Sequence, residues 1–196
     1  MSIFGNRRKK ADSVEHIQAV LGREKESQEP EHILRHRRNR QLFLACQRGD
    51  LQKVKELLEK GASVHARWGE TNDTPLIYAA DPGHIELVEF LLDKGADINA
   101  RNYNGVTALM AAAKYGRTET VGLLIDRGAD VNIKDENGWT AMTYAAANGQ
   151  TETVLLMIEK KVPVNPRDKR NRTPIRWAYE HSHTDTMLLL MRNGAE

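Results

Sequence analysis

The chain has 196 residues, enough for one domain or two small ones, and its formal charge of +2 implies no bulk polyanionic partner. The single cysteine, Cys46, excludes an intramolecular disulfide framework and suits a reducing compartment, so we expect a cytoplasmic protein, with the nucleus as the alternative. No apolar run approaches the roughly 18 residues that a transmembrane helix needs.

Residues 1–37 are predicted to form a basic, partly disordered leader. Residues 1–40 hold ten Lys or Arg and six Asp or Glu, a net charge of +4. The start runs directly into Arg7–Lys10 without an apolar stretch, which argues against a secretory signal. We expect short helices over residues 14–21 and from Pro30 onward. The leader is either a solvated extension or an electrostatic contact for an acidic partner, nucleic acid or anionic lipid.

From residue 38 onward the sequence repeats itself at a fixed period. The stretch Thr74–Asn99 reads TPLIYAADPGHIELVEFLLDKGADIN, and it returns 33 residues later over Thr107–Asn132 and again over Thr140–Asn165. A weaker copy starts at Thr173. A period of this size is typical of a solenoid of stacked units and not of one globular core.

Each copy predicts two helices joined by a turn. Thr74 suits the N-cap of the first helix and Pro75 its first residue, because Pro lacks the N–H group that would otherwise be unsatisfied. Gly83 stands where that helix must stop. The second helix carries Val88 and Leu91 on one apolar face.

An extended loop, here called a finger, follows the second helix of each copy. Two fingers contain Asn-Gly, at 104–105 and 137–138, the dipeptide preferred in tight hairpin turns, so we expect β-hairpin fingers. Asn171 replaces the glycine in the last finger and should adopt a positive φ. The finger over residues 67–73 is one residue longer than the others, which changes the surface and leaves the stack intact.

This pattern resembles the ankyrin repeat, whose usual wording is close to T-P-L-H-x-A-A-x-x-G-H, a Val- or Leu-rich helix, and G-A-D-x-N. The resemblance implies an all-α repeat solenoid over residues 38–196. Its five units are expected at about 38–67, 68–101, 102–134, 135–167 and 168–196. The first unit lacks the Thr-Pro start and suits an N-terminal cap, and the fifth, with Ser182 in a glycine position, is a C-terminal cap or a frayed end.

The resemblance further implies a non-catalytic module that binds a protein partner, as an adaptor, scaffold or inhibitor, along the concave surface lined by fingers and first helices. Carried over position by position, the protein-binding candidates are Trp68, Glu70, Thr71, Asp73, Asp81, Tyr103, Asn104, Val106, Lys114, Tyr115, Glu136, Asn137, Trp139, Asn148, Lys169, Arg170 and Arg172.

Four of these candidates are large aromatic residues, the type from which interface hot spots are made: Trp68, Tyr103, Tyr115 and Trp139. The alternative is that Tyr103 or Trp139 packs against a neighbouring finger and braces the stack. Three other aromatic residues fall at the buried phase of the first helices and are expected in the core: Tyr78, Tyr144 and Trp177.

Charge along the candidate surface is graded. Acidic Glu70, Asp73 and Asp81 lie toward its N-terminal end, and Lys169, Arg170 and Arg172 lie at the far end. A partner with the opposite polarity would be steered into one orientation.

No catalytic, cofactor or metal site is expected. The histidine pairs at 32/36 and 181/183 have no third ligand nearby in sequence, whereas zinc takes three or four. Phosphate-binding loops and nucleophile motifs are absent. Cys46 takes the position of Ala80 and is expected to be a packed small residue. Leu155 and Leu188 fall on the outward face of second helices, where they are ordinary surface residues, a seat for the leader, or a weak self-association site.

Overall fold

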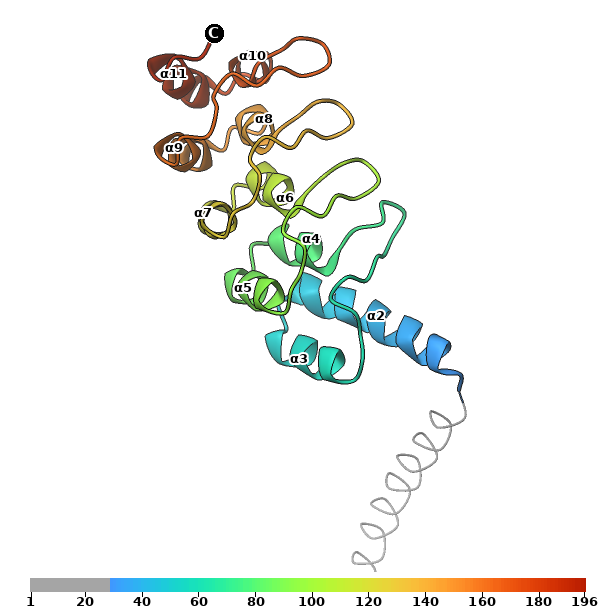
Figure 1. Ribbon diagram of the computed structural model, residues 1–196. Coiled ribbons are helices and arrows are strands. Elements are labelled where there is room, and N and C mark those ends of the chain that lie inside the picture. Colours follow the sequence, from blue (N-terminus) through green and yellow to red (C-terminus); the bar gives the residue numbers. More distant parts are fainter. Residues whose placement is uncertain (1–28) are drawn as a thin grey trace, which may run out of the picture. The chain divides into compact units, whose positions relative to one another are not determined.

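The computed structural model describes residues 29–196, and within that range the regular structure is entirely helical (Figure 1). Two units divide the chain, residues 1–38 and residues 39–196, and each is described by itself. The helices are α2 (Glu31–Arg48), α3 (Leu51–Glu59), α4 (Pro75–Ala80), α5 (Ile85–Asp93), α6 (Ala108–Lys114), α7 (Thr118–Asp126), α8 (Ala141–Ala147), α9 (Thr151–Glu159), α10 (Pro174–Glu180) and α11 (Thr184–Arg192).

The described part of the first unit, residues 29–38, contains the start of α2. The Pro30 carbonyl accepts hydrogen bonds from the N–H groups of Ile33 and Leu34 at 2.9 and 3.2 Å, so a helix does open at Pro30, as predicted. Because α2 continues to Arg48, the predicted end of the leader at residue 37 falls inside a helix. The helix predicted over residues 14–21 lies outside the described residues.

The second unit is a stack of helix pairs in two rows (Figure 1). In Figure 1 the helices α4, α6, α8 and α10 follow one another in the row beside the fingers. The helices α3, α5, α7, α9 and α11 form the other row. Within each row, successive helices from α4 onward pack on one another. The predicted all-α repeat solenoid is confirmed.

The core of the second unit lies between the two rows. Its finger-side helices contribute alanines that are fully buried, such as Ala80, Ala113 and Ala146, so neighbouring helices can approach closely. The other row contributes larger side chains, such as Leu91 and Leu124, which are also fully buried. Burying one leucine side chain contributes about 2 kcal/mol, and no helix pair does so alone, so stability is shared between neighbours.

The starts of α4, α6 and α8 are capped by threonine, as the sequence predicts. Thr74, Thr107 and Thr140 each accept a hydrogen bond on Oγ1 from the N–H group three residues later, at 3.2 to 3.4 Å. The fourth threonine differs, because the Thr173 hydroxyl donates to the Glu196 carbonyl at 2.8 Å.

The β-hairpin form of the fingers is not confirmed. Among residues 29–196 the β-bridge that joins Trp68 and Asp73 stands alone, outside any strand. These two residues exchange both backbone hydrogen bonds, at 3.1 and 2.9 Å, in the finger that carries the extra residue. A shorter finger closes with one such bond, as between the Asn102 N–H group and the Val106 carbonyl at 3.0 Å.

In the last part of the chain, three positions with positive φ that hold glycine in earlier repeats hold another residue type. Asn171 has φ of 60°, as predicted, and so has Lys161, while Ser182 has 61°. A Cβ on the equivalent Gly149 would lie 2.5 Å from His183 of the following repeat. Ser182 of the fifth repeat is exposed, so its side chain meets no such obstacle among the described residues.

Candidate functional site

The backbone of each finger is held by one side chain at its base. In the fingers 101–106, 134–139 and 167–172, an Oδ1 atom accepts hydrogen bonds from the N–H groups two and four residues later, at 2.8 to 3.0 Å. The acceptors are Asn102, Asp135 and Asp168. These three residues are not among the predicted site residues, although Asn or Asp just before a turn is a recognisable sequence signal for such a contact.

Backbone hydrogen bonds also join successive fingers. The N–H groups of Tyr103, Glu136 and Lys169 each donate to a carbonyl of the preceding finger, at 2.8 to 3.0 Å. The turn of each finger is therefore positioned against its neighbour, and the side chains beside it project from a fixed backbone.

Long basic side chains link the fingers in the opposite direction. Arg67 donates to the Arg101 carbonyl at 2.7 Å, Arg101 to the Lys134 carbonyl at 3.0 Å, and Lys134 to the Arg167 carbonyl at 3.0 Å. Arg167 instead donates to Asn171 within its own finger, at 3.3 Å. These basic groups hold the fingers together, so they are less available to bind a partner than Lys169 and Arg170 at the turn of the last finger.

Tyr103 and Tyr115 are the exposed aromatic candidates. Tyr103, in the finger 101–106, is 66% exposed, and Tyr115, at the end of α6, is 44% exposed. The Lys114 ammonium lies 5.0 Å from the Tyr115 ring centroid. Among the described residues neither tyrosine ring packs against another aromatic ring. Both rings therefore offer apolar area to a partner.

Trp68 and Trp139 are half-buried and pack against other rings. Trp68 stacks on Phe43 with centroids 6.1 Å apart. Trp139 meets Tyr144 at 5.1 Å and Trp177 of the next repeat at 4.4 Å, both edge to face. Trp139 thus makes contacts between repeats, as the bracing alternative describes, although its partner is a helix residue and not a neighbouring finger.

The prediction that Tyr78, Tyr144 and Trp177 lie in the core is wrong in part, because all three are only half-buried. For Tyr144 and Trp177 the physical reason is the polar group of the ring system, which hydrogen-bonds an aspartate at the base of a finger. The Tyr144 hydroxyl donates to Asp135 at 2.8 Å, and the Trp177 indole N–H group donates to Asp168 at 3.1 Å. Burial first, and then the hydrogen bond and charge of Asp135, raise the pKa of Tyr144.

Asp168 is one of two buried carboxylates at the bases of the fingers, with Asp135. Burial by itself would raise the pKa of the Asp168 carboxyl, but hydrogen bonds from the Arg172 and Arg170 backbone and from Trp177, together with the Arg172 charge, lower it below its ordinary value. The Arg172 guanidinium lies 3.5 Å from the Trp177 ring centroid and forms an ion pair with Asp168 at 3.2 Å. Asp168 therefore remains a carboxylate at neutral pH.

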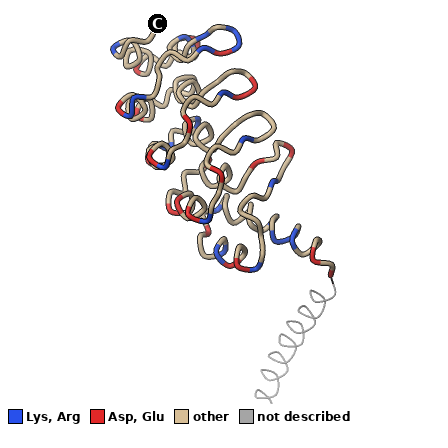
Figure 2. Tube along the Cα trace, viewed as in Figure 1, with Lys and Arg blue, Asp and Glu red and all other residues tan. Residues whose placement is uncertain are grey.

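The remaining candidates divide by exposure. Those with exposed side chains are Glu70, Asp81, Asn104, Glu136, Asn137, Asn148, Lys169 and Arg170. Those that are half-buried are Thr71, Asp73, Val106, Lys114 and Arg172. Thr71 donates to Asp73, and Asp73 also accepts from the Asn102 amide at 2.7 Å, so these candidates already serve the fingers. Figure 2 shows the change from acidic residues on the first finger to basic residues on the last.

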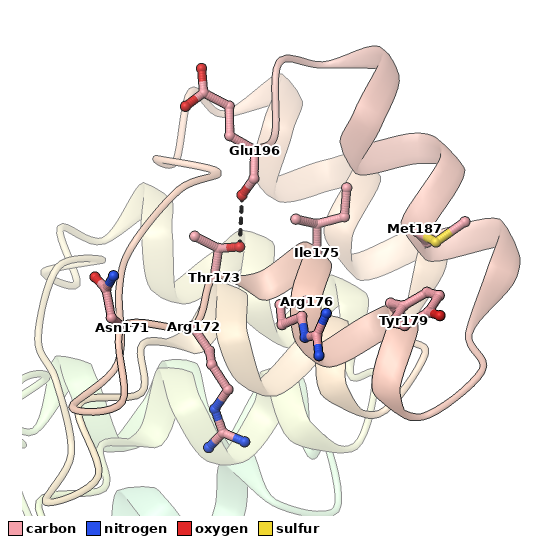
Figure 3. Close-up of a pocket in the computed structure, with 8 residues that line it drawn as sticks. All are labelled: Asn171, Arg172, Thr173, Ile175, Arg176, Tyr179, Met187 and Glu196. Carbon is pink, nitrogen blue, oxygen red and sulfur yellow. Dashed lines mark hydrogen bonds between the residues drawn. The ribbon is translucent and has the colours of Figure 1, made fainter.

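A hollow of about 530 Å³ lies on the end face of the fifth repeat (Figure 3). It is lined by Asn171 and Arg172 of the last finger, by the start and one face of α10, and by Met187 and Glu196. Arg176 and Tyr179 stand there in place of Thr143 and Ala146 of the preceding repeat, which are buried. Polar or amphipathic replacements on an outer face are what a terminal repeat of a solenoid requires.

Three further predicted residues lie as follows. Cys46 is fully buried, and burial raises the pKa of its thiol to about 12, so the reactive thiolate is not formed at neutral pH. Leu155 on α9 and Leu188 on α11 are 44% and 40% exposed. Both lie on the row of helices away from the fingers (α3, α5, α7, α9 and α11), here called the outer row.

Within residues 29–196, no helix combines the length and the apolar character needed to cross a membrane. A comparison with protein-family models matches the family described as ankyrin repeats in three copies, at residues 11–102, 42–135 and 109–196. A search of curated proteins finds no significant match.

Proposed function

Because the chain belongs to the ankyrin repeat family, whose repeats are generally protein–protein interaction modules, we propose that it binds a protein partner along the surface formed by its finger turns and the ends of α4, α6, α8 and α10. The role is that of a non-catalytic adaptor, scaffold or inhibitor. The proposal places it in a reducing compartment, in the cytoplasm or alternatively the nucleus, because its only cysteine is a buried thiol.

One observation carries this proposal: Tyr103 is 66% exposed although its backbone is fixed. Its N–H group donates to the Thr71 carbonyl at 2.8 Å, and Asn102 closes the same finger. Exposing a large ring costs solvation free energy that packing inside the protein would have recovered. Because the finger is already ordered, a partner that covers this ring loses little conformational entropy on binding.

Tyr115 adds a second exposed ring at the end of α6, where Lys114 lies over it. Tyrosine combines large contact area with few rotatable bonds, and such residues dominate binding free energy when they are buried at the centre of an interface. Trp68 and Trp139, which are half-buried, would contribute less through new contacts and more by holding the surface in shape.

The test is affinity capture with the full chain, identification of the bound protein by mass spectrometry, and titration of that protein against variants. Tyr103→Ala should weaken binding by about 2 kcal/mol, roughly 30-fold. The melting temperature should change little, because an exposed ring supports little packing. Met191→Ala is the control, since Met191 is 55% exposed but lies on α11, in the row away from the fingers. Equal affinity for Tyr103→Ala and the wild type would place the partner elsewhere.

The leader provides the rival function, binding of nucleic acid or an anionic membrane through its basic residues. Deletion of residues 1–37 distinguishes the two functions. If the leader is the binding site, the deleted protein should lose all binding, whereas binding through the finger surface should remain. The rival also requires a steep salt dependence in the full chain.

Self-association through the outer row is a second alternative, favoured by the exposure of Leu155 and Leu188. Analytical ultracentrifugation of the wild type and of a Leu155→Glu, Leu188→Glu double variant tests it. A wild type that sediments as a monomer at high concentration rules this alternative out.

A further inference from the structure

We infer that the finger 167–172, together with the surface of α10 beside it, binds an acidic segment of the partner protein. This finger is called the basic finger below. The inference rests on the proposed function and adds the chemistry of the partner at one end of the surface.

The charge of the basic finger is the first observation. It contains Arg167, Lys169, Arg170 and Arg172 with one acidic residue, the buried Asp168 (Figure 2). By comparison, the fingers 101–106 and 134–139 contain one basic residue each. Such a concentration of one sign on a single turn attracts a group of opposite charge and orients it.

Two of these cations have no partner among the described residues. Arg172 pairs with Asp168 and Glu180, and Arg167 donates to the Asn171 carbonyl. The Lys169 ammonium and the Arg170 guanidinium take part in no ion pair or hydrogen bond within residues 29–196, and both side chains are exposed. The buried carboxylate does not compensate them, because its oxygens already accept from four donors at 2.8 to 3.2 Å.

A hollow of about 390 Å³ lies beside these cations. Side chains of two successive fingers and of α10 line it: Asn137, Trp139, Asp168, Lys169, Arg170, Arg172 and Trp177. Its aromatic walls can contact an apolar side chain, while its rim presents the two uncompensated cations. A peptide with carboxylates next to an apolar residue matches both features.

The ring geometry favours a peptide over a nucleic acid. Single-stranded nucleic acids need open ring faces on which bases stack. One face of Trp177 is covered by the Arg172 guanidinium at 3.5 Å, the His181 ring stacks at 5.6 Å, and Trp139 meets Trp177 edge to face at 4.4 Å. The rings therefore serve as fixed walls and not as stacking platforms.

The charge of the rest of the solenoid limits the length of the acidic segment. Residues 41–196 carry 19 Lys or Arg against 21 Asp or Glu. A long polyanion that left the basic finger would meet exposed carboxylates such as Glu136 and Glu70 on earlier fingers. A short acidic stretch flanked by neutral or basic residues therefore matches the charge of both the basic finger and the earlier fingers.

The test is selection of a random 16-residue peptide library displayed on phage against the full chain. We expect the enriched peptides to be acidic and to contain an apolar residue among the carboxylates. A synthetic copy of an enriched peptide should then bind at least about tenfold more weakly to a Lys169→Glu, Arg170→Glu variant, and its affinity should fall with added salt. The matched control, Lys94→Glu with Arg192→Glu, makes the same change in net charge at exposed positions on the outer row and should bind as the wild type does.

Circular dichroism melting of each variant confirms that it is folded. Enrichment of uncharged or basic peptides that compete with the captured partner would overturn the acidic-segment inference and leave the proposed function standing. If, in addition, the captured partner bound the Tyr103→Ala variant as tightly as the wild type, the proposed function and the acidic-segment inference would both fail. Binding of a random RNA pool more tightly than the acidic peptide, with loss in the Lys169→Glu, Arg170→Glu variant, would assign the basic finger to nucleic acid instead.

Discussion

Asp168 shows how one buried carboxylate organises a finger. Its Oδ1 atom accepts from two backbone N–H groups, and its Oδ2 atom accepts from Arg172 and Trp177. Asn102 makes the equivalent backbone contacts with an amide oxygen, so the charge is not required for the turn itself. The charge is required for the link to the tryptophan and the arginine.

We therefore expect Asp168→Ala to lower the free energy of unfolding by about 2–3 kcal/mol, because several hydrogen bonds are lost and donors are left unsatisfied. Asp168→Asn should cost about 1 kcal/mol less, since it retains the Oδ1 acceptor. Urea unfolding monitored by circular dichroism measures both. Glu136→Gln, at an exposed carboxylate of another finger, is the control and should change little.

The same carboxylate gives a pH dependence with a definite sign. The folded-state pKa of Asp168 is below its ordinary value of 3.8, so the stabilisation is present above that pH and is lost as pH falls through the lower folded pKa. The difference in stability between the wild type and Asp168→Asn should be constant near neutral pH and shrink in acid. A difference that grows as pH falls would contradict this assignment.

Lys161 adopts φ of 60°, which an L side chain rarely adopts, whereas the equivalent positions in earlier repeats hold glycine. Lys161→Gly should raise the free energy of unfolding by about 1 kcal/mol, and the melting temperature by about 3 °C. The reverse change, Gly95→Lys, tests the reason, because Gly95 has φ of 85° and open space around its Cβ position. It should destabilise by a similar amount, and no loss there would show that the backbone is not strained.

Sequence phase alone predicts the buried small residues of the helices well, and it predicts the exposure of the aromatic residues poorly, on the helices as at the fingers. The caps at Thr74, Thr107 and Thr140 and the buried alanines follow from local pattern, because each has one dominant contact. Trp139 and Tyr103 looked alike in the sequence, and the structure separates them because Trp139 has a ring to meet in the next repeat. That partner, Trp177, is 38 residues away, so no local pattern predicts the contact.

At the scale of the helix, the four threonine caps are not equivalent. Thr107 accepts from the Met110 N–H group at 3.3 Å, whereas Thr173 makes no such cap and donates to the Glu196 carbonyl. Thr107→Ala should cost about 1 kcal/mol through the lost cap. Thr173→Ala should cost less, since it removes a hydrogen bond near the end of the described chain. Thermal melts of the two variants compare them directly, and a larger loss at Thr173 would contradict the cap assignment.

The backbone contacts of the fingers explain why the hairpin expectation is not confirmed. Asn-Gly predicts a tight turn, and Gly105 and Gly138 do have positive φ, at 78° and 82°. Each shorter finger keeps one backbone bond across its own base, such as that from Asn102 to Val106, while the next N–H group, as at Tyr103, donates to the neighbouring finger. Local sequence specifies the turn, but the stack decides with which chain segment the backbone pairs.

At the scale of the solenoid, each repeat is stabilised by its neighbours, so internal repeats should open least often. Within residues 39–196 we expect the slowest amide hydrogen exchange in the second to fourth repeats and faster exchange in the first and fifth. Exchange measured by mass spectrometry at peptide resolution checks this order. Equal protection of the fifth repeat would mean that its end face is covered in solution.

The end face of the fifth repeat resembles the end group of a polymer, because Tyr179 and Arg176 occupy positions that hold Ala146 and Thr143 one repeat earlier. Those buried small side chains accept a following unit, and the larger ones obstruct it. A further repeat should therefore fit between internal repeats but should not pack on the end face of the fifth repeat. A duplicate of residues 102–134 inserted after Lys134 should join the series of finger contacts and raise the melting temperature, whereas the same cassette appended after Glu196 should remain undocked and add no cooperative unfolding signal.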